Sequence, residues 1–389
     1  MSRHRDGAAR RRMSRGPVIA VVLVVAVVLA IFGWFGLRDR IDAQRVSAAD
    51  SCVSGQSTLE VAANSSIAPA LTELAERYTA KNTVIRDHCI RVVVRAASDQ
   101  RVLAGLQGTW DNATLGAPPA AWVPLDSSSS AQLAAAKPAF VTDKIRSLAT
   151  SPLLLAVPRA AAQAISAANL SWADLPKLQS AADGWSRFGQ PNWGALTIAT
   201  PTGRDGSTAA ALTTQAVAAA LSGTAPVTAE VLARPATISA IAALRLKPRP
   251  QPTNTASALS AMTGLSNIKD SPFQAVPATE QQIFDVSQDP GSTPLATVQL
   301  AGATPMADFP FVGIKAPWVD DTQGRAAAAF SEFLGQPDQQ KVLAAAGFRS
   351  GDAPLPAATP AVSFAPVGTV LPAPDAAAAA AVDALLTKP

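Results

Sequence analysis

The alternation of apolar strands with amphipathic helices over residues 57–126 constrains the fold of this chain more than any other feature of its sequence. "TLEVAAN" is followed by "SSIAPALTELAERYTAKN", in which Ile67, Leu71, Leu74 and Tyr78 recur at the spacing of one helix face. The strand "CIRVVVRAASD", the helix "QRVLAGLQGTW" and the short strand "AAWVPLD" come next. This alternation predicts a parallel sheet with helices on its faces, and therefore an α/β fold.

A second α/β section follows an apolar run over residues 147–158, which is typical of a segment that leaves one sheet and enters another. "LTIATP", "LATVQL" and "FPFVGI" predict strands, "FQAVPATEQQIFDV" a strand followed by a helix, and "DGSTAAALTTQAVAAAL" a long helix. We therefore predict two interleaved lobes, about 57–148 with 303–352 and about 149–302, that enclose a cleft. Residues 353–389 are mostly Ala and Pro and predict an extended strap that ends in a short helix.

The uncharged residues 18–37 predict a transmembrane helix, because twenty helical residues span about 30 Å, the thickness of the hydrocarbon core. Six Arg lie in residues 1–17, which predicts a cytoplasmic tail and an extracytoplasmic folded domain after the polar linker of residues 38–56. A cleaved signal peptide is the alternative, but its apolar region has about 7 to 15 residues, and only a poor cleavage site near Ala49 follows. We predict a single-pass protein of the cell membrane.

The composition disfavours two classes of function. The formal net charge is +4, but residues 1–45 hold nine Arg against three Asp, which leaves 23 basic and 25 acidic residues elsewhere. The folded part therefore has no electrostatic signature of nucleic-acid binding. Only His88 lies outside the N-terminal tail, so no Ser-His or Cys-His pair and no multi-histidine metal site can be assembled. We predict that the chain is not an enzyme and uses no cofactor.

Two cysteines, Cys52 and Cys89, lie on the predicted extracytoplasmic side, where disulfides persist. Each precedes a predicted strand, and if these strands are parallel neighbours, both cysteines lie at the same edge of the sheet. A disulfide there is geometrically reasonable and contributes about 3 to 4 kcal/mol in the chain-entropy model. Two buried free thiols are the alternative.

The stretch "WVPLDSSSS", residues 122–130, has three interpretations. Asp126, Ser128 and Ser130 match the DxSxS metal motif of a von Willebrand type A domain, but two strand and helix units precede them and no further metal loops follow. A run of serines is also typical of a flexible linker. The third interpretation is a strand-to-helix turn at the edge of a cleft, with one of the serines as the helix cap, because an apolar strand and "AQLAAA" flank the run.

Other strand-to-helix turns provide further candidates. "TPTGRDGSTAAAL" combines a glycine turn, the guanidinium of Arg204 and the start of a long helix, a combination that suits an anion or a polar oxygen. A glycine turn with a solvent-facing Arg204 is the equally plausible alternative. Asp308, in "MADFPF", either faces the cleft or only satisfies backbone groups at a hinge, and Glu280, in "PATEQQ", is most simply a helix start.

The ordered set "TLEVAANSSIAPALTELAERYT", "VVVRAASDQRVLAGL", "WVPLDSSSS", "SPLLLAVP", "SWADL", "AVPATEQQIF", "DFPFV" and "AAGFRSGD" resembles bacterial extracellular solute-binding proteins of the type II periplasmic-binding-protein fold. The resemblance covers about residues 57–352 and implies a two-lobed clamshell that closes on a ligand. It places the ligand-contacting turns on Ser65, Ser66, Asp126, Ser127, Ser128, Ser151, Arg204, Asp205, Ser207 and Thr208.

The nearest resemblance is to membrane-anchored actinobacterial members, many of which carry a von Willebrand type A domain after the binding module. This sequence stops about where that domain would begin and has "WVPLDSSSS" where relatives often have "WVPDSS". We expect capture of a small polar or anionic solute, in partnership with a transporter, and no metal site. The alternative is an interaction or envelope-assembly module that uses the same fold and binds no small ligand.

Overall fold

The computed structural model describes residues 52–202, 207–248, 251–263, 270–288 and 295–387. The predicted cytoplasmic tail, transmembrane helix and most of the linker lie outside these ranges. In the described ranges, no helix is both long enough and apolar enough to cross a membrane.

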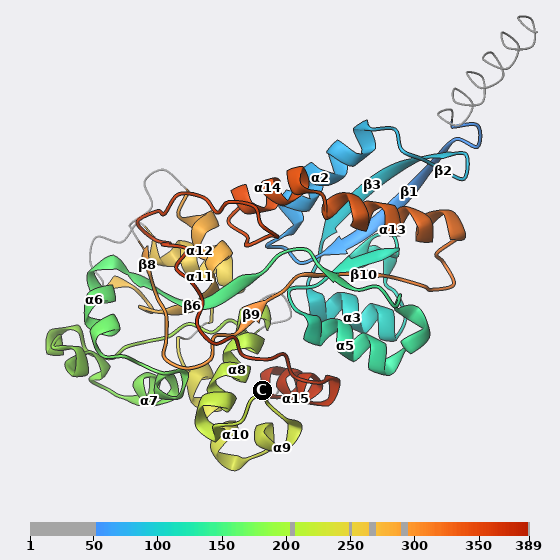
Figure 1. The fold of residues 1–389 in the computed structure, drawn as a ribbon. Helices are drawn as coiled ribbons and strands as arrows, with labels where there is room; N and C mark the ends of the chain where they lie inside the picture. Colours follow the sequence, from blue (N-terminus) through green and yellow to red (C-terminus); the bar gives the residue numbers. More distant parts are fainter. Residues whose placement is uncertain (1–51, 203–206, 249–250, 264–269, 289–294, 388–389) are drawn as a thin grey trace, which may run out of the picture.

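The first sheet holds six strands in the order β2-β3-β1-β4-β10-β5, and the central strand β1 runs parallel to both β3 and β4 (Figure 1). This confirms the parallel arrangement predicted for the first part of the chain. The later strand β10 returns antiparallel between β4 and the edge strand β5. The strands are β1 (Gln56–Ala63), β2 (Val84–Ile85), β3 (His88–Ala96), β4 (Ala121–Val123), β5 (Arg146–Ser147) and β10 (Pro310–Gly313).

Helices cover both faces of this sheet because strands β1 and β4 carry apolar side chains on both sides. The helices α2 and α13 pack on the face that carries Leu59 and Val61, with α14 against α2 and α13, and α3 and α5 pack on Trp122 of the opposite face. The helices of this lobe are α2 (Ala68–Ala80), α3 (Asp99–Gln107), α4 (Asn112–Leu115), α5 (Ser127–Ala136), α13 (Asp321–Leu334) and α14 (Pro337–Ala345).

The second sheet is built around the buried strand β6 (Ser151–Pro158), which pairs antiparallel with β7 (Val276–Thr279), β8 (Leu295–Val298) and β9 (Met306–Ala307). The surrounding helices are α6 (Arg159–Ala167), α7 (Leu175–Ser180), α8 (Ser207–Ser222), α9 (Ala229–Leu232), α10 (Pro235–Arg245), α11 (Thr255–Met262) and α12 (Glu280–Val286). Short 3-10 turns connect them at Trp172–Asp174, Gly184–Phe188 and Pro191–Trp193.

The prediction of a strand at "LTIATP" is wrong, since this segment makes only an isolated bridge between Ile198 and Ala275. Side-chain amides take the place of a longer strand ladder there. Gln179 Oε1 accepts a hydrogen bond from the Ile198 N–H at 2.7 Å, and Gln274 Oε1 accepts one from the Thr197 N–H at 2.8 Å. Backbone groups satisfied in this way need no neighbouring strand.

The predicted disulfide is confirmed between Cys52 and Cys89. The parallel pairing of β1 with β3 sets Gln56 opposite Cys89, so the segment that precedes β1 returns to the start of β3. The bridge therefore fastens the first described residues to the edge of the first sheet.

The two lobes are in close contact. The chain passes from the first sheet to the second between β5 and β6 and returns from β8 through β9 to β10. One apolar cluster contains Leu59 and Phe330 from the first lobe together with Leu153, Trp172 and Leu212 from the second. The lobes therefore share an apolar core.

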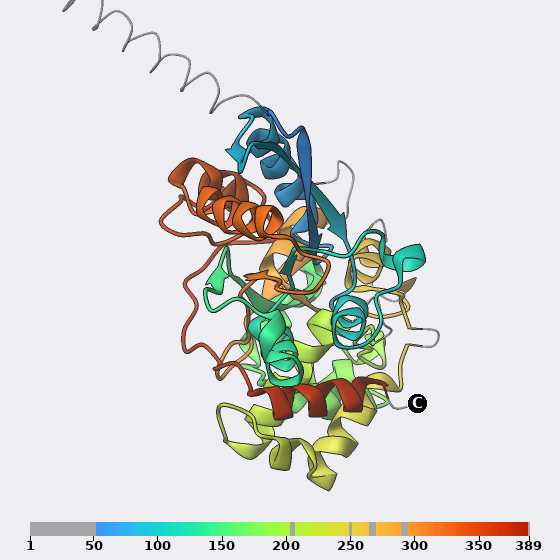
Figure 2. The ribbon, with the colours of Figure 1, turned by 90° about the vertical axis from the view of Figure 1, so that its right-hand side faces the viewer.

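The last part of the chain crosses the molecule again. Beyond Gly351 it runs extended over the second lobe, where the Ala361 carbonyl accepts a hydrogen bond from the Thr297 N–H at 3.1 Å. It ends in α15 (Ala376–Thr387), which Figure 2 shows in dark red between helices of the first lobe and the yellow-green helices of the second.

Candidate functional site

The stretch "WVPLDSSSS" forms a strand-to-helix turn at the carboxyl end of β4. The Asp126 carboxylate accepts hydrogen bonds from the N–H groups of Ser128 and Ser129 at 3.0 and 3.3 Å, and from the Ser128 hydroxyl at 2.5 Å. Asp126 is therefore the helix cap, and the serines form the first turn of α5. The linker interpretation is wrong because all four serines are helical, and the prediction of a serine cap is off by one residue.

Asp99 lies beside this turn and was not among the predicted site residues. Its Oδ2 accepts hydrogen bonds from Asn64 Nδ2 at 2.8 Å and from the Leu125 N–H at 3.0 Å, and so joins the ends of β1, β3 and β4. The only sequence signal was its position at a helix start directly after a strand, which it shares with Asp126. Asn64 also fixes Ser66, whose hydroxyl donates to the side-chain oxygen Oδ1 of Asn64 at 2.6 Å.

Asp308 completes the same region from the returning segment before β10. Its Oδ1 accepts a hydrogen bond from the Ser127 N–H at 2.7 Å, and its backbone carbonyl accepts one from the Ser147 hydroxyl at 2.6 Å. Of the two roles considered for Asp308, satisfaction of backbone groups at the crossing is the one these contacts support.

A small cavity of about 20 Å³ lies where this region of the first lobe meets α8 and α15. Its volume is about that of one water molecule. Asp99 and Asp126 line it from the first lobe, Gln215 from α8, and Val382 and Asp383 from α15. Two of the buried polar atoms in this lining, Asp99 Oδ1 and Gln215 Nε2, have no hydrogen-bond partner among the described residues.

The lining of the cavity is acidic. Burial raises the pKa of Asp99 to about 7 and the pKa of Asp126 to about 6, and the Asp308 carboxyl adds to the second shift. Burial also raises the pKa values of Asp308 and Asp383. Among the described residues that line the cavity, none is Lys or Arg. A negative charge there is therefore not neutralised by a neighbouring cation.

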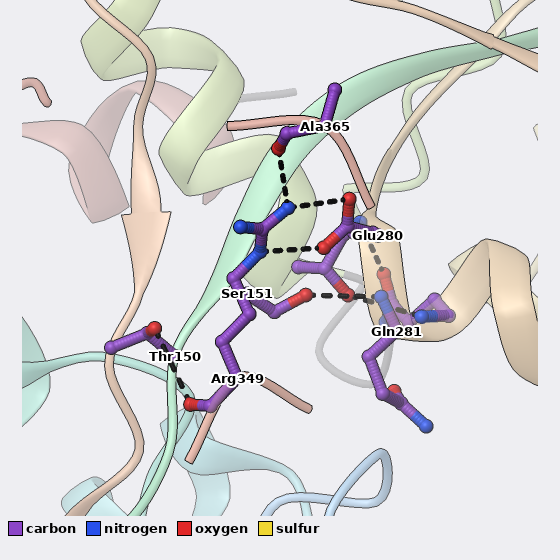
Figure 3. A network of polar contacts seen from close by, with 8 residues as sticks. Thr150, Ser151, Glu280, Gln281, Arg349 and Ala365 are labelled. Atoms are coloured by element: carbon purple, nitrogen blue, oxygen red, sulfur yellow. Dashed lines mark hydrogen bonds and ion pairs between the residues drawn. The ribbon is translucent and has the colours of Figure 1, made fainter. Parts of the chain in front are cut away.

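A second polar junction connects the lobes at the start of β6 (Figure 3). Arg349 donates to both carboxylate oxygens of Glu280, at 2.8 and 3.0 Å, and to the Ala365 carbonyl at 2.7 Å. The Ser151 hydroxyl accepts a hydrogen bond from the Gln281 N–H at 3.0 Å, and the backbones of Thr150 and Arg349 pair with each other. Glu280 thus does more than begin a helix, because it fastens the crossing chain.

The ten residues predicted to contact a ligand do not form one site in the structure. Asp126 and Ser128 line the cavity, while Ser66 holds the neighbouring turn and Ser127 contacts Asp308 through its backbone. Ser151 is fully buried in the second junction, 0 % exposed, and Ser65 is exposed on the turn. Ser207 and Thr208 begin α8, and Arg204 and Asp205 lie outside the described residues.

No group of three or more His, Cys, Asp or Glu side chains in the described ranges is arranged to hold a metal ion. The carboxyls around the cavity are engaged with backbone and hydroxyl donors, as the contacts of Asp126 and Asp308 show.

The two α/β lobes, with a cavity between the strand ends of the first lobe and α8 of the second, define a periplasmic-binding-protein-like fold. Solved structures of that fold match the chain: iron-bound HitA from Pseudomonas aeruginosa superposes with a TM-score of 0.55 at 13% identity, over 85% of this chain and 99% of HitA. A ferric binding protein from Campylobacter jejuni gives a TM-score of 0.53 at 12% identity, over 84% and 96% of the two chains. At these identities the likeness establishes the fold alone.

The chain belongs to the bacterial extracellular solute-binding protein family, whose model matches residues 59–349. Uncharacterized proteins from two Mycobacterium tuberculosis strains, CDC 1551 and H37Rv, are 34% identical to it over 363 residues, which cover 93% of this chain and 52% of theirs. The chain therefore spans about half the length of the curated relatives that it matches.

Proposed function

We propose that this chain captures a small polar solute between its two lobes, at the carboxyl ends of β1, β3 and β4. The observation that carries this proposal is the pair of unsatisfied buried groups in the cavity, Asp99 Oδ1 as an acceptor and Gln215 Nε2 as a donor. Buried polar atoms in native proteins almost always have a partner, so an unpartnered pair on opposite lobes is consistent with a ligand that bridges them. Membership of a solute-binding family supports the capture of a solute.

The described lining favours a solute that offers hydrogen-bond donors or a positive charge. Asp99, Asp126 and Asp383 contribute carboxyls, and no described Lys or Arg opposes them. The predicted anionic ligand depends on Arg204, which precedes α8 and lies outside the described residues. That alternative stays a prediction.

The test is a thermal-shift measurement on the full chain, with putrescine and choline as cationic probes and phosphate and molybdate as anionic probes. A probe at a hundred times its Kd stabilises the folded state by about 2.7 kcal/mol. A rise in Tm with a cationic probe that disappears in Asp99→Asn supports the proposal. A rise with an anion that disappears in Arg204→Ala supports the anionic alternative and contradicts the preference for a cation.

A second function, an interaction or envelope-assembly module without a small ligand, is favoured by one observation. The helix α15 covers the cavity and leaves only about 20 Å³ of free space, which admits no solute larger than water. If no probe stabilises the chain even when α15 is displaced, solute capture is contradicted and this second function is supported.

We also propose that residues 18–37 anchor the protein in the cell membrane, with the folded part outside and a transporter or envelope protein as partner. The uncharged length of this segment, the Cys52–Cys89 disulfide and the extracellular family support this topology. Extraction of membranes with alkaline carbonate tests it, since a chain with residues 18–37 in the bilayer stays in the pellet and a peripheral chain is released.

A further inference from the structure

The helix α15 joins the two lobes over the cavity (Figure 2). Its apolar face, with Ala378, Val382, Leu385 and Leu386, is buried in a cluster with α8 and α9 of the second lobe. Val382 also lines the cavity together with residues of α3 and α5 from the first lobe. The helix therefore has contacts on both sides of the boundary.

Polar contacts fix α15 on both lobes. Gln132, on α5, donates to the Asp383 carboxylate at 2.9 Å, and Gln100, on α3, donates to it at 3.4 Å. On the second lobe, Arg245 donates to the Leu385 carbonyl at 2.8 Å, which satisfies a carbonyl in the last turn of the helix. Opening the two lobes requires that one of these sets of contacts breaks.

The charges that face α15 differ between its two sides. Towards the first lobe, Asp383 meets Asp99 at the start of α3 and Asp126 at the start of α5, with Asp308 beside Asp126. Towards the second lobe, Arg245 faces the last turn, as described above.

At the other end of the helix, Asp375 caps α15 and lies near Glu230 of α9. Docking of α15 thus brings the Asp383 carboxyl next to the buried carboxyls of Asp99 and Asp126. Burial raises the pKa values of all three.

We propose that α15 is a latch over the inter-lobe cavity, which is docked at acidic pH, loosens as the pH rises, and leaves when a solute enters. The proposal rests on the solute site proposed above. Protonated carboxyls can be buried close together, whereas ionised carboxyls repel one another. The docked state is therefore favoured at low pH and loses this advantage as Asp99, Asp126 and Asp383 ionise.

Hydrogen-exchange mass spectrometry on the full chain tests the latch, with Val382→Asp to displace α15 and Ala384→Asp as the matched control. Ala384 is exposed on the same helix, so the control adds the same charge without burying it. After correction for intrinsic rates, we expect exchange in residues 376–387 and 127–136 to be at least about tenfold faster in Val382→Asp and unchanged in the control. Equal exchange in Val382→Asp and wild type would overturn the latch.

A second variant keeps the test independent of a folding defect in the first. We expect the corrected exchange of residues 376–387 in the wild type to be about tenfold faster at pH 8 than at pH 5, since one pKa unit corresponds to a factor of ten. Asp383→Asn removes one carboxyl and should reduce this difference. Exchange without pH dependence, or an unchanged difference in Asp383→Asn, contradicts a pH-sensitive latch.

Probe binding to the same variants distinguishes a failure of the latch proposal from a failure of the solute proposal. If α15 is released in Val382→Asp and neither putrescine nor phosphate stabilises that variant, the solute proposal fails and α15 remains a pH-sensitive clamp between lobes. If putrescine stabilises the wild type without faster exchange in residues 376–387, the latch fails and solute binding stands.

Discussion

The two polar junctions between the lobes differ in whether their charges are satisfied. At the start of β6, the Arg349 guanidinium donates to both carboxylate oxygens of Glu280, and its Nη2 also donates to the Ala365 carbonyl. At the cavity, Asp99 and Asp126 lie in a buried acidic group with one unpartnered oxygen, and no Lys or Arg is among the described residues of the lining. A satisfied pair stabilises one arrangement of the chain, whereas an unsatisfied acidic group is sensitive to pH and to ligands.

The largest expected effect is at the satisfied junction. Arg349→Met leaves the Glu280 carboxylate, whose side chain is 3% exposed, without its partner, and we expect the free energy of unfolding to fall by about 3 to 5 kcal/mol. Urea denaturation measures this change. The double variant with Glu280→Gln should recover much of the loss, because the buried charge is then gone as well. A loss below about 1 kcal/mol in Arg349→Met would show that the pair is not structural.

Changes at the acidic cavity should alter how the free energy of unfolding depends on pH. The pKa of Asp99 is raised from 3.8 to about 7, so the folded state binds its proton more tightly than the unfolded state does. The resulting stability is full below about pH 4 and is lost as the pH rises through about 7. Asp99→Asn, which keeps an acceptor for Asn64 and Leu125, should lessen this decline by about 2 to 4 kcal/mol in urea titrations between pH 4 and 8.

Asp338→Asn serves as the control for this pH series, because Asp338 is an exposed carboxyl whose pKa is lowered by its hydrogen bond with Lys341. It should leave the decline between pH 4 and 8 in place. If Asp99→Asn shows the same decline as Asp338→Asn, the Asp99 carboxyl does not carry the pH sensitivity of the junction.

The smallest expected effect concerns the unpartnered amide on the second lobe. Gln215→Met removes a buried donor while it keeps the side-chain length, and we expect a gain of about 1 kcal/mol in the free energy of unfolding. Gln179→Met is the matched comparison, since Gln179 is equally buried but bonds to the backbone of Ile198 in both directions, and its loss should destabilise. Destabilisation by both variants would indicate that Gln215 has a partner in solution.

Much of the first lobe could be predicted because local patterns agree with the tertiary structure there. The apolar spacing of Leu71, Leu74 and Tyr78 placed a helix beside the strands, and the parallel pairing brought Cys52 and Cys89 together as expected. The second lobe was harder, because a short apolar stretch such as "LTIATP" has the same pattern whether its backbone pairs with a strand or with the side chains of Gln179 and Gln274.

In the candidate site, too, local features were predicted from the sequence and contacts between distant residues were not. The turn at Asp126 was found from sequence because a carboxylate and serines after an apolar strand favour a helix start. The partnership of Asp99 with Asn64, and that of Arg349 with Glu280, join residues 35 and 69 positions apart, and no local pattern encodes such contacts.

The sequence by itself determined the α/β class and the strand-to-helix turns, because each depends on hydrophobic periodicity or on residues close along the chain. It favoured the Cys52–Cys89 disulfide, which joins residues 37 positions apart, because the predicted parallel strands place both cysteines at one edge of the sheet. The tertiary structure alone decided that α15 returns to cover the cavity and brings Asp383 to Gln132, 251 positions away. Where an Ala-rich helix docks depends on the shape and charge of surfaces assembled from distant segments, and these exist only in the folded protein.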